Sequence, residues 1–562
     1  MKLSQNNLTS RYTVLMCAVI LCLGACNNAG PVKTTESESQ SSDRTKWFVD
    51  AKYGMFIHWG PYAVAGGEWE GKHYYGSGEL IKGQAHISQE EYEELSRRFN
   101  PVKFDAEQWV DIARQAGMKY ITITTIHSDG FLMYHSKESN FNIFDFTPFK
   151  RDPLKELSEA CRKAGIKLCV YCSKRKSQLK EILTGYGPIG MAWFDGGGLT
   201  KEQAQEISDW VHSFQPDCLV SERIGHGLGE IKGFGDSEFP KEVIKEPAEA
   251  ITTHNDSWGY IERDNNWKSP KEIIHHLVKC NAKGANFMLN VGPKGDGTFP
   301  EMAVAVIKNA GQWISKHEES IYGTTHSPFP ELSWGECTHR PGKLYLHVLE
   351  WPDDLKLRVP SIAGNVESIR LLVGGKKLKY TRDGKDILVH LPVPCPDPVN
   401  TVIVVNYTGD LNIDPVRTLM ENCDVELDAF HADISGSANH LGIYFMEEYG
   451  SWYKADLINK WSSEKDMASW EFRAPKAGLY AVELDYSYPT SSTKREGLIM
   501  IDDNEKLYFE CKSTGDQRHH FQKQPVGVIR VSEPGYHKLS IRPTGEGEEF
   551  IKLRTLRLSM FE

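Results

Sequence analysis

Short apolar runs, each ending in polar or aromatic residues, recur through the first 300 residues of the chain. They include residues 54–59, 120–125, 167–171, 218–221 and 286–291, and a further run ends at Trp193-Phe-Asp195, before three glycines. Between them lie amphipathic stretches with helix-start signals at Asp105, Asp152-Pro153, Thr200 and Ser269-Pro270. This alternation, which continues to about Ile321, predicts an α/β fold with a (β/α)8-like barrel. In such a barrel the C-terminal strand ends and the loops after them build the active site.

The pattern changes beyond Ser327, where the helical signal disappears. Short β runs at 343–349, 368–373, 387–391 and 401–406 predict one β-sandwich, and a second β set follows a joint at 410–415. The sequence therefore predicts a barrel over 47–325, a sandwich over 326–408 and a second sandwich over 415–562. The stretches 468–480 and 535–541 of the second sandwich resemble carbohydrate-binding modules, and a structural domain that binds no ligand is the alternative.

The N-terminus has the features of a secretory signal. Residues 13–25 are apolar, follow the basic Lys2 and Arg11, and end at Cys26. The sequence Leu23-Gly-Ala-Cys26 resembles the bacterial lipobox, in which the cysteine is lipidated, and a plain signal peptide with a chance cysteine is the alternative. We therefore expect a signal over 1–26, a flexible polar tether over 27–46, and an exported protein anchored by lipid in the periplasm or outer membrane.

The net charge and the cysteine spacing exclude several classes of binding partner and cofactor. A formal net charge of −11 and an isoelectric point near 6.0 give no electrostatic reason to bind nucleic acid or an anionic membrane surface. The membrane is therefore expected to be reached only through the lipid anchor. Nine cysteines outside the signal, at irregular spacing, form no disulfide framework, and Cys169-Val-Tyr-Cys172 is better explained by packing than by zinc. No motif indicates a metal or an organic cofactor, and the oligomeric state is left open.

Six local motifs, in order, resemble the α-L-fucosidases of glycoside hydrolase family 29. The motifs are Lys52-Tyr-Gly-Met-Phe-Ile-His-Trp-Gly60, Glu68-Trp69, His127-Ser-Asp-Gly-Phe131, Trp193-Phe-Asp195, Asn255-Asp-Ser-Trp-Gly-Tyr260 and Asn286-Phe-Met-Leu-Asn-Val-Gly-Pro293. The resemblance covers roughly residues 47–325, and the first sandwich is similar to the C-terminal β domain of the same enzymes. It implies a retaining exo-glycosidase that removes terminal α-L-fucose from glycans.

The resemblance also implies roles for individual residues. Asp195 matches the catalytic nucleophile, which forms a covalent glycosyl-enzyme. His58 and His127 match sugar-binding histidines, and Glu68 with Trp69 matches the Glu-Trp pair of the loop after the first strand. Three further positions match substrate-binding residues, although a packing or ion-pairing role is an alternative for each: Tyr171, Trp193 and Arg223.

The general acid/base is the least defined position. Counting back from Trp258 leads to Glu249, which matches the family's glutamate except that Ala248 stands where the family has tryptophan. Glu238 is the main alternative and Glu246 the third. The true residue needs a raised pKa and a place near the glycosidic oxygen.

Two departures from the family pattern affect the expected activity. Ser128 stands where the family commonly has a second histidine, and a long segment normally found after the strand ending at Tyr171 is missing beyond Ser173. We therefore expect a pocket open on that side and weak catalysis. The alternatives are an inactive fucoside-binding protein on a fucosidase barrel and an enzyme for a related sugar such as an α-L-galactoside.

Overall fold

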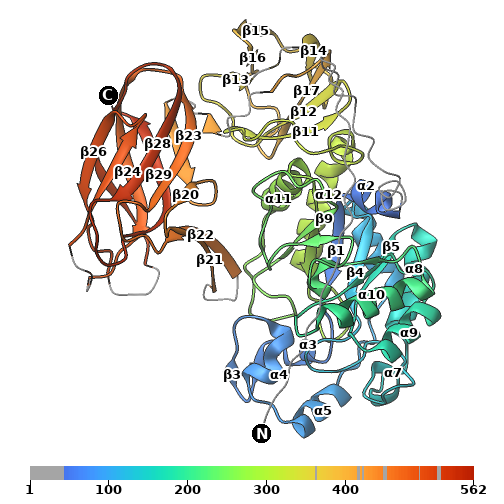
Figure 1. Cartoon of the computed structure of the whole chain (residues 1–562). Coiled ribbons are helices and arrows are strands. Elements are labelled where there is room, and N and C mark those ends of the chain that lie inside the picture. The colour runs from blue at the N-terminus through green and yellow to red at the C-terminus, as the bar shows by residue number, and fades with distance from the viewer. Residues whose placement is uncertain are drawn as a thin grey trace, which may run out of the picture. The chain divides into compact units, whose positions relative to one another are not determined.

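A computed structural model gives the fold of the chain (Figure 1). It describes residues 44–360, 362, 364–413, 418–419, 423–446, 452–490, 492, 494–515 and 520–561. The expected signal and the lipidation site at Cys26 lie outside the described residues. Within those residues, no helix combines the length and the apolar character needed to cross a membrane.

Eight parallel strands form the barrel, in the order β7-β6-β5-β4-β1-β10-β9-β8. The two edge strands are joined by a single parallel bridge between Ser221 and Ile231, which closes the sheet on itself. The predicted barrel is therefore confirmed. The strands are β1 (Tyr53–Ile57), β4 (Tyr120–Thr124), β5 (Lys167–Tyr171), β6 (Met191–Trp193), β7 (Leu219–Val220), β8 (Lys232–Gly233), β9 (Ala248–Thr253) and β10 (Ala285–Val291).

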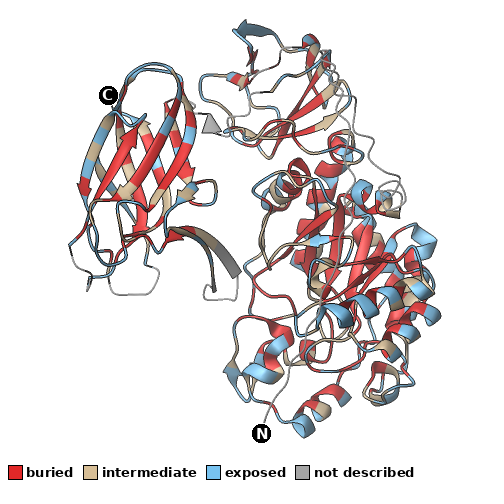
Figure 2. Cartoon of the chain, in the orientation of Figure 1, coloured by how far each residue is buried: buried red, intermediate tan, exposed pale blue. Residues whose placement is uncertain are grey.

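Helices cover the outside of the barrel with their apolar faces inward, so that buried and exposed residues alternate along each one (Figure 2). The predicted caps are present: Asp105 and Asp152 accept hydrogen bonds from the first helical turn, and capping boxes begin at Thr200 and Ser269. The helices are α2 (Lys46–Ala51), α6 (Ala106–Gln115), α8 (Pro153–Ala164), α9 (Lys176–Gly185), α10 (Lys201–Phe214), α11 (Pro270–Ala282) and α12 (Glu301–Ile321).

The connections at the C-terminal strand ends differ greatly in length. The segment after β1 is the most elaborate, whereas only four residues, 172–175, separate the end of β5 from the start of α9. The short connection expected after Ser173 is therefore present. The elements after β1 are α3 (Tyr62–Ala65), β2 (Glu68–Trp69), β3 (Lys72–His73), the 3-10 turn η1 (Gly78–Leu80), α4 (Ile81–Gln84) and α5 (Gln89–Arg97); α7 (Ile143–Phe146) follows β4, and the 3-10 turn η2 (Glu222–Ile224) follows β7.

Two all-β parts follow the barrel, as the sequence predicts, and each consists of two sheets around its own apolar core. The strands pair antiparallel, except for one short parallel pairing at residues 418–419 in the second part. The first part pairs sheet β11-β12-β17-β14 with sheet β13-β16-β15, and its strands are β11 (Gly335–Arg340), β12 (Lys343–Val348), β13 (Lys356–Val359), β14 (Asn365–Leu371), β15 (Tyr380–Asp383), β16 (Asp386–His390) and β17 (Thr401–Thr408). The strands of the second part are β18 (Thr418–Leu419), β19 (Asp424–Asp428), β20 (Asp433–Ser435), β21 (Asn439–Met446), β22 (Trp452–Asn459), β23 (Met467–Ala474), β24 (Gly478–Ser487), β25 (Glu496–Ile501), β26 (Glu505–Glu510), β27 (Gln522–Val531), β28 (Gly535–Pro543) and β29 (Lys552–Met560).

Candidate active site

Polar and aromatic side chains gather where four neighbouring barrel strands end. His58 follows β1, His127 follows β4, Tyr171 ends β5, and Trp193 ends β6, with Asp195 two residues further on. Because parallel strands place their C-terminal ends at the same edge, these residues come together at the top of the barrel.

Aromatic rings line this cluster. The ring centroids of His127 and Tyr171 are 5.4 Å apart and those of Tyr171 and Trp193 are 5.5 Å apart, both in stacked geometry. The His58 ring lies 5.5 Å from that of His127 and 5.2 Å from that of Trp258. Such a ring-lined site suits the mixed apolar and polar surface of a small sugar.

Burial keeps the imidazole rings of His58 and His127 uncharged, so each ring has one hydrogen-bond donor and one acceptor. Burial lowers the pKa of His58 well below its usual value, and His127 acts in the same direction. Burial also lowers the pKa of His127 to about 4, against the opposing effect of Asp195. Asn290 orients the site from below: its side-chain oxygen is 2.7 Å from His58 Nδ1, and its amide donates to the Trp258 carbonyl at 2.7 Å.

One guanidinium joins two carboxylates at the mouth of the cluster. Arg223, on η2, donates through Nη1 to Asp195 Oδ1 at 3.1 Å and through Nη2 to Asp236 Oδ1 at 2.7 Å. The Tyr171 hydroxyl donates to the other oxygen of Asp195 at 3.4 Å. Both carboxylates remain open to solvent, with side chains 37% and 43% exposed, whereas that of Arg223 is 18% exposed. Both carboxylates can therefore contact a substrate while they stay hydrogen-bonded to Arg223.

Glu249 lies inside the barrel instead. It is the second residue of β9, is 3% exposed, and accepts hydrogen bonds from the Tyr120 hydroxyl and from Trp193 Nε1 at 3.1 Å. Burial raises its pKa to about 7, although both hydrogen bonds oppose that shift. The void beside Glu249 and Trp193 measures about 10 Å³, which holds at most one water. Its raised pKa fits an acid, but a glycosidic oxygen has no room there.

The remaining predicted residues are placed as follows. Glu68 and Trp69 form strand β2 of a small hairpin, where Glu68 is half exposed and its carboxylate lies 3.4 Å from His73 Nδ1. No hydrogen bond or ring contact among the described residues joins either side chain to the Asp195 cluster. Glu238 accepts a hydrogen bond from the Gly235 amide, and Glu246 is exposed just before β9, at the opposite end of the barrel.

Three residues of the cluster were not among the predicted site residues: Asp236, Asn290 and Trp258. Asp236 follows β8, a strand of two residues that has no apolar run to mark it. The sequence pointed only to this loop, through Glu238, the alternative acid/base two residues after Asp236. Asn290 lies within a motif that carried the family resemblance, but its two contacts depend on tertiary structure.

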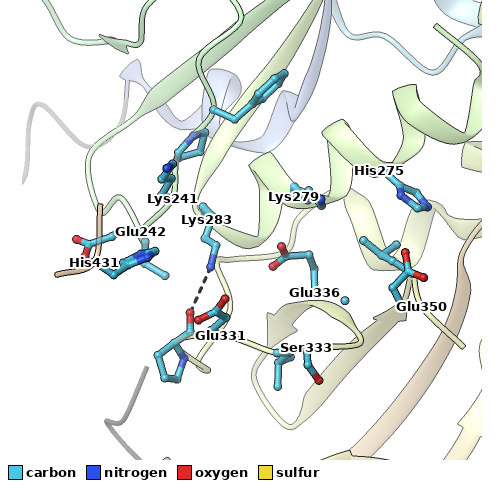
Figure 3. Close-up of a pocket in the computed structure, with 17 residues that line it drawn as sticks. Lys241, Glu242, His275, Lys279, Lys283, Glu331, Ser333, Glu336, Glu350 and His431 are labelled. Atoms are coloured by element: carbon cyan, nitrogen blue, oxygen red, sulfur yellow. Dashed lines mark hydrogen bonds between the residues drawn. The ribbon is translucent and has the colours of Figure 1, made fainter. Parts of the chain in front are cut away.

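A larger cavity, of about 550 Å³, lies elsewhere and is lined by both acidic and basic side chains, among them Lys279, Lys283, Glu331 and Glu336 (Figure 3). Lys283 follows α11 directly before β10 begins, so this cavity belongs to the N-terminal end of the strands, opposite Asp195. Barrel enzymes do not carry out their chemistry at that end. Within the residues that the structure describes, no group of three or more His, Cys, Asp or Glu side chains is arranged to hold a metal ion.

Family models identify the relationship of the chain to known proteins. The model described as alpha-L-fucosidase matches residues 22–177 and 174–319, which is more than half of the chain. A model described as a domain of unknown function, DUF5077, matches residues 447–560. The first match covers all eight barrel strands, and the second lies within the last β part.

Individual proteins similar to the chain are also alpha-L-fucosidases. The chain is 26% identical over 407 residues to an alpha-L-fucosidase of Dictyostelium discoideum, covering 63% of this chain and 87% of the relative. It is 27% identical over 403 residues to the plasma alpha-L-fucosidase of Homo sapiens, covering 62% and 85% of the two chains.

Solved structures extend the similarity to the β parts. An alpha-L-fucosidase from Vibrio sp. strain EJY3 superposes with a TM-score of 0.75 at 26% identity, covering 93% of this chain and 98% of that one. A Bacteroides thetaiotaomicron alpha-L-fucosidase, trapped as a covalent intermediate with 2-fluoro-fucosyl fluoride in a mutant that has one glutamate replaced by glutamine, gives a TM-score of 0.62 at 26% identity, covering 68% and 98%. The chain therefore belongs to the α-L-fucosidases of glycoside hydrolase family 29.

Proposed function

We propose that this protein removes terminal α-L-fucose from glycans by double displacement, with Asp195 as the nucleophile and Asp236 as the general acid/base. The observation that carries the proposal is the shared hydrogen bonding of both carboxylates to Arg223. A retaining mechanism needs two carboxyl groups close together, about 5–5.5 Å apart, and a guanidinium that binds both carboxylates holds them near each other. The covalent intermediate trapped in the Bacteroides relative supports the same route.

In the first step, Asp195 attacks the anomeric carbon while the Asp236 carboxyl group gives its proton to the departing glycosidic oxygen. In the second step, Asp236 takes a proton from a water molecule, which then attacks the fucosyl ester on Asp195. The sugar leaves with its configuration retained. Asp236 thus loses its proton in the first step, stays ionised between the steps and regains a proton in the second, so it ends the cycle as it began.

Asp236 is favoured over Glu249 because of access. Glu249 is 3% exposed and already accepts from Tyr120 and Trp193, so it supports Trp193 from below. Its raised pKa is the effect of burial on a carboxyl group and does not require a substrate nearby. We infer that Glu249 is a positioning residue for the floor of the pocket.

Recognition of the sugar is assigned to neutral donors and rings. His58 and His127 are uncharged at neutral pH, so each imidazole offers one donor and one acceptor to ring hydroxyls. The half-buried Tyr171 offers a face for the apolar side of fucose, including its C5 methyl group, and the buried Trp193 and Trp258 belong to the ring cluster behind it.

The stereochemistry of the first product tests this proposal. An aryl α-L-fucoside is hydrolysed in an NMR tube, and the anomer that forms first is recorded before mutarotation. The α-anomer is expected. First formation of the β-anomer would show inversion, and no hydrolysis at all would favour a binding protein on a fucosidase barrel.

We also propose that the protein is exported and anchored by a lipid on Cys26. The support is the apolar segment over 13–25 and the lipobox-like Leu23-Gly-Ala-Cys26. The polar tether that follows would leave the barrel free to meet glycans outside the membrane.

A further inference from the structure

Lys174 crosses the opening left by the short connection after β5. It is one of only four residues between Tyr171 and the start of α9. Its Nζ donates to the carbonyl oxygen of Gly197 at 2.9 Å. The contact links the connection after β5 to the loop after β6, which carries the nucleophile two residues earlier in the sequence.

The turn that Lys174 contacts has one other anchor nearby, the contact of His226 Nε2 with the Leu199 carbonyl oxygen at 2.7 Å. Residues 196–198 are three glycines, and Gly196 and Gly198 have φ angles of +63° and +94°, which suit glycine. A Cβ placed on any of the three would meet no atom within 4 Å. Such a turn is costly to order, because glycine loses the most conformational freedom on folding. Lys174 therefore supplies an anchor next to Asp195 that the turn's own side chains cannot provide.

The ammonium group also lies within the electrostatic reach of the nucleophile. Burial lowers the pKa of Lys174, and the Asp195 carboxylate raises it. Five other polar or titratable groups face Asp195 directly or through Arg223, and they come from five different strand ends: His58, His127, Tyr171, Arg223 and Asp236. Lys174 is thus the second cation of the site, and it approaches from the side where the family has a longer segment.

We propose that Lys174 is a positioning residue that replaces the missing wall, holding the 196–198 turn so that the Asp195 carboxylate keeps its angle of attack. This rests on the proposed role of Asp195 as nucleophile. A fixed turn matters most when the covalent bond forms, since small misplacements of a reacting group cost much rate. The loss of Lys174 should therefore lower kcat more than it raises KM.

Three variants test this in the full-length protein with an aryl α-L-fucoside. Lys174→Met keeps the length of the side chain but removes its donor and charge, and kcat should fall about tenfold with KM within about twofold. Lys174→Arg keeps both properties and should restore kcat to within about threefold. Arg175→Met is the matched control, because Arg175 is an exposed cation in the same connection, and both constants should stay unchanged.

Hydrogen exchange supplies a second readout that does not require turnover. Amides of residues 196–199 should exchange faster in Lys174→Met than in the wild type or in Arg175→Met. Unchanged kcat and unchanged exchange in Lys174→Met, or an equal loss in Arg175→Met, would overturn the inference. A wild-type protein that turns over no fucoside would remove the proposed function, while the exchange data would still decide whether Lys174 holds the turn.

Discussion

Asp195 and Asp236 accept hydrogen bonds from the same guanidinium, at 3.1 and 2.7 Å, although 40 residues separate them in the sequence. Arg223 keeps the two carboxyl groups close, and each group retains one oxygen that Arg223 does not contact. The chemistry of a retaining glycosidase needs two such groups, one to attack and one to transfer protons. This relationship, rather than any single motif, defines the candidate site.

Replacing Asp195 with glycine should lower kcat by at least about 10³-fold, because the covalent step has no other carboxylate in its place. Sodium azide should restore part of the turnover by entering the vacated space and attacking the anomeric carbon, giving fucosyl azide. The measurement is the rate on an aryl fucoside with and without azide. Activity that survives the substitution largely intact would remove Asp195 from its role.

Replacing Asp236 with alanine should affect substrates according to their leaving groups. A fucosylated disaccharide needs protonation of its departing oxygen, so kcat/KM should fall about 10²–10⁴-fold, whereas a dinitrophenyl fucoside should lose far less in the first step. Glu249→Gln and Glu238→Ala are the controls, and neither should depend on the leaving group. If Glu249→Gln shows that dependence and Asp236→Ala does not, Glu249 is the acid/base.

The burial of Glu249 should make stability depend on pH. Burial raises its pKa from 4.5 in the unfolded chain to about 7, so the folded protein binds this proton more tightly. The resulting stabilisation is complete below pH 4.5 and is lost as the pH rises to about 7, an effect of about 3 kcal/mol. Glu249→Gln has no such proton, so its melting temperature relative to the wild type should rise between pH 5 and pH 8. A constant difference across that range would contradict the assignment.

Replacing Cys26 with serine should move the protein from the membrane fraction to the soluble fraction of the cells that express it, because acyl chains would be its only anchor. Fractionation followed by immunoblotting measures this. Lys2→Gln, which keeps the cysteine, is the matched control. Continued membrane association of the Cys26→Ser variant would point to a different mode of retention.

The sequence predicted the barrel and the strand-end residues because both depend on local patterns. The helix starts at Thr200 and Ser269 and the apolar run before Asp195 are short-range signals, and they appear in the structure where expected. The ring stacking among His127, Tyr171 and Trp193 follows from their positions at adjacent strand ends.

The second carboxylate could not be found in the same way. Strand β8 has two residues, Lys232 and Gly233, so no periodicity marks the loop that carries Asp236. Glu249 occupies an interior position of β9, and the depth of a residue inside a barrel depends on strand register, which the sequence alone does not give. Arg223 hydrogen-bonds to Asp195 and Asp236 in two other loops, and only the tertiary structure brings these three loops together.

The most direct test of the central claim is the site of covalent labelling by 2-fluoro-fucosyl fluoride, the compound that trapped the Bacteroides relative. The intact mass of the wild-type protein should increase by one 2-fluoro-fucosyl group, and peptide mapping should place that group on Asp195. The Asp195→Gly variant should stay unlabelled. A label on any other carboxylate, or labelling of the Asp195→Gly variant, would contradict the account.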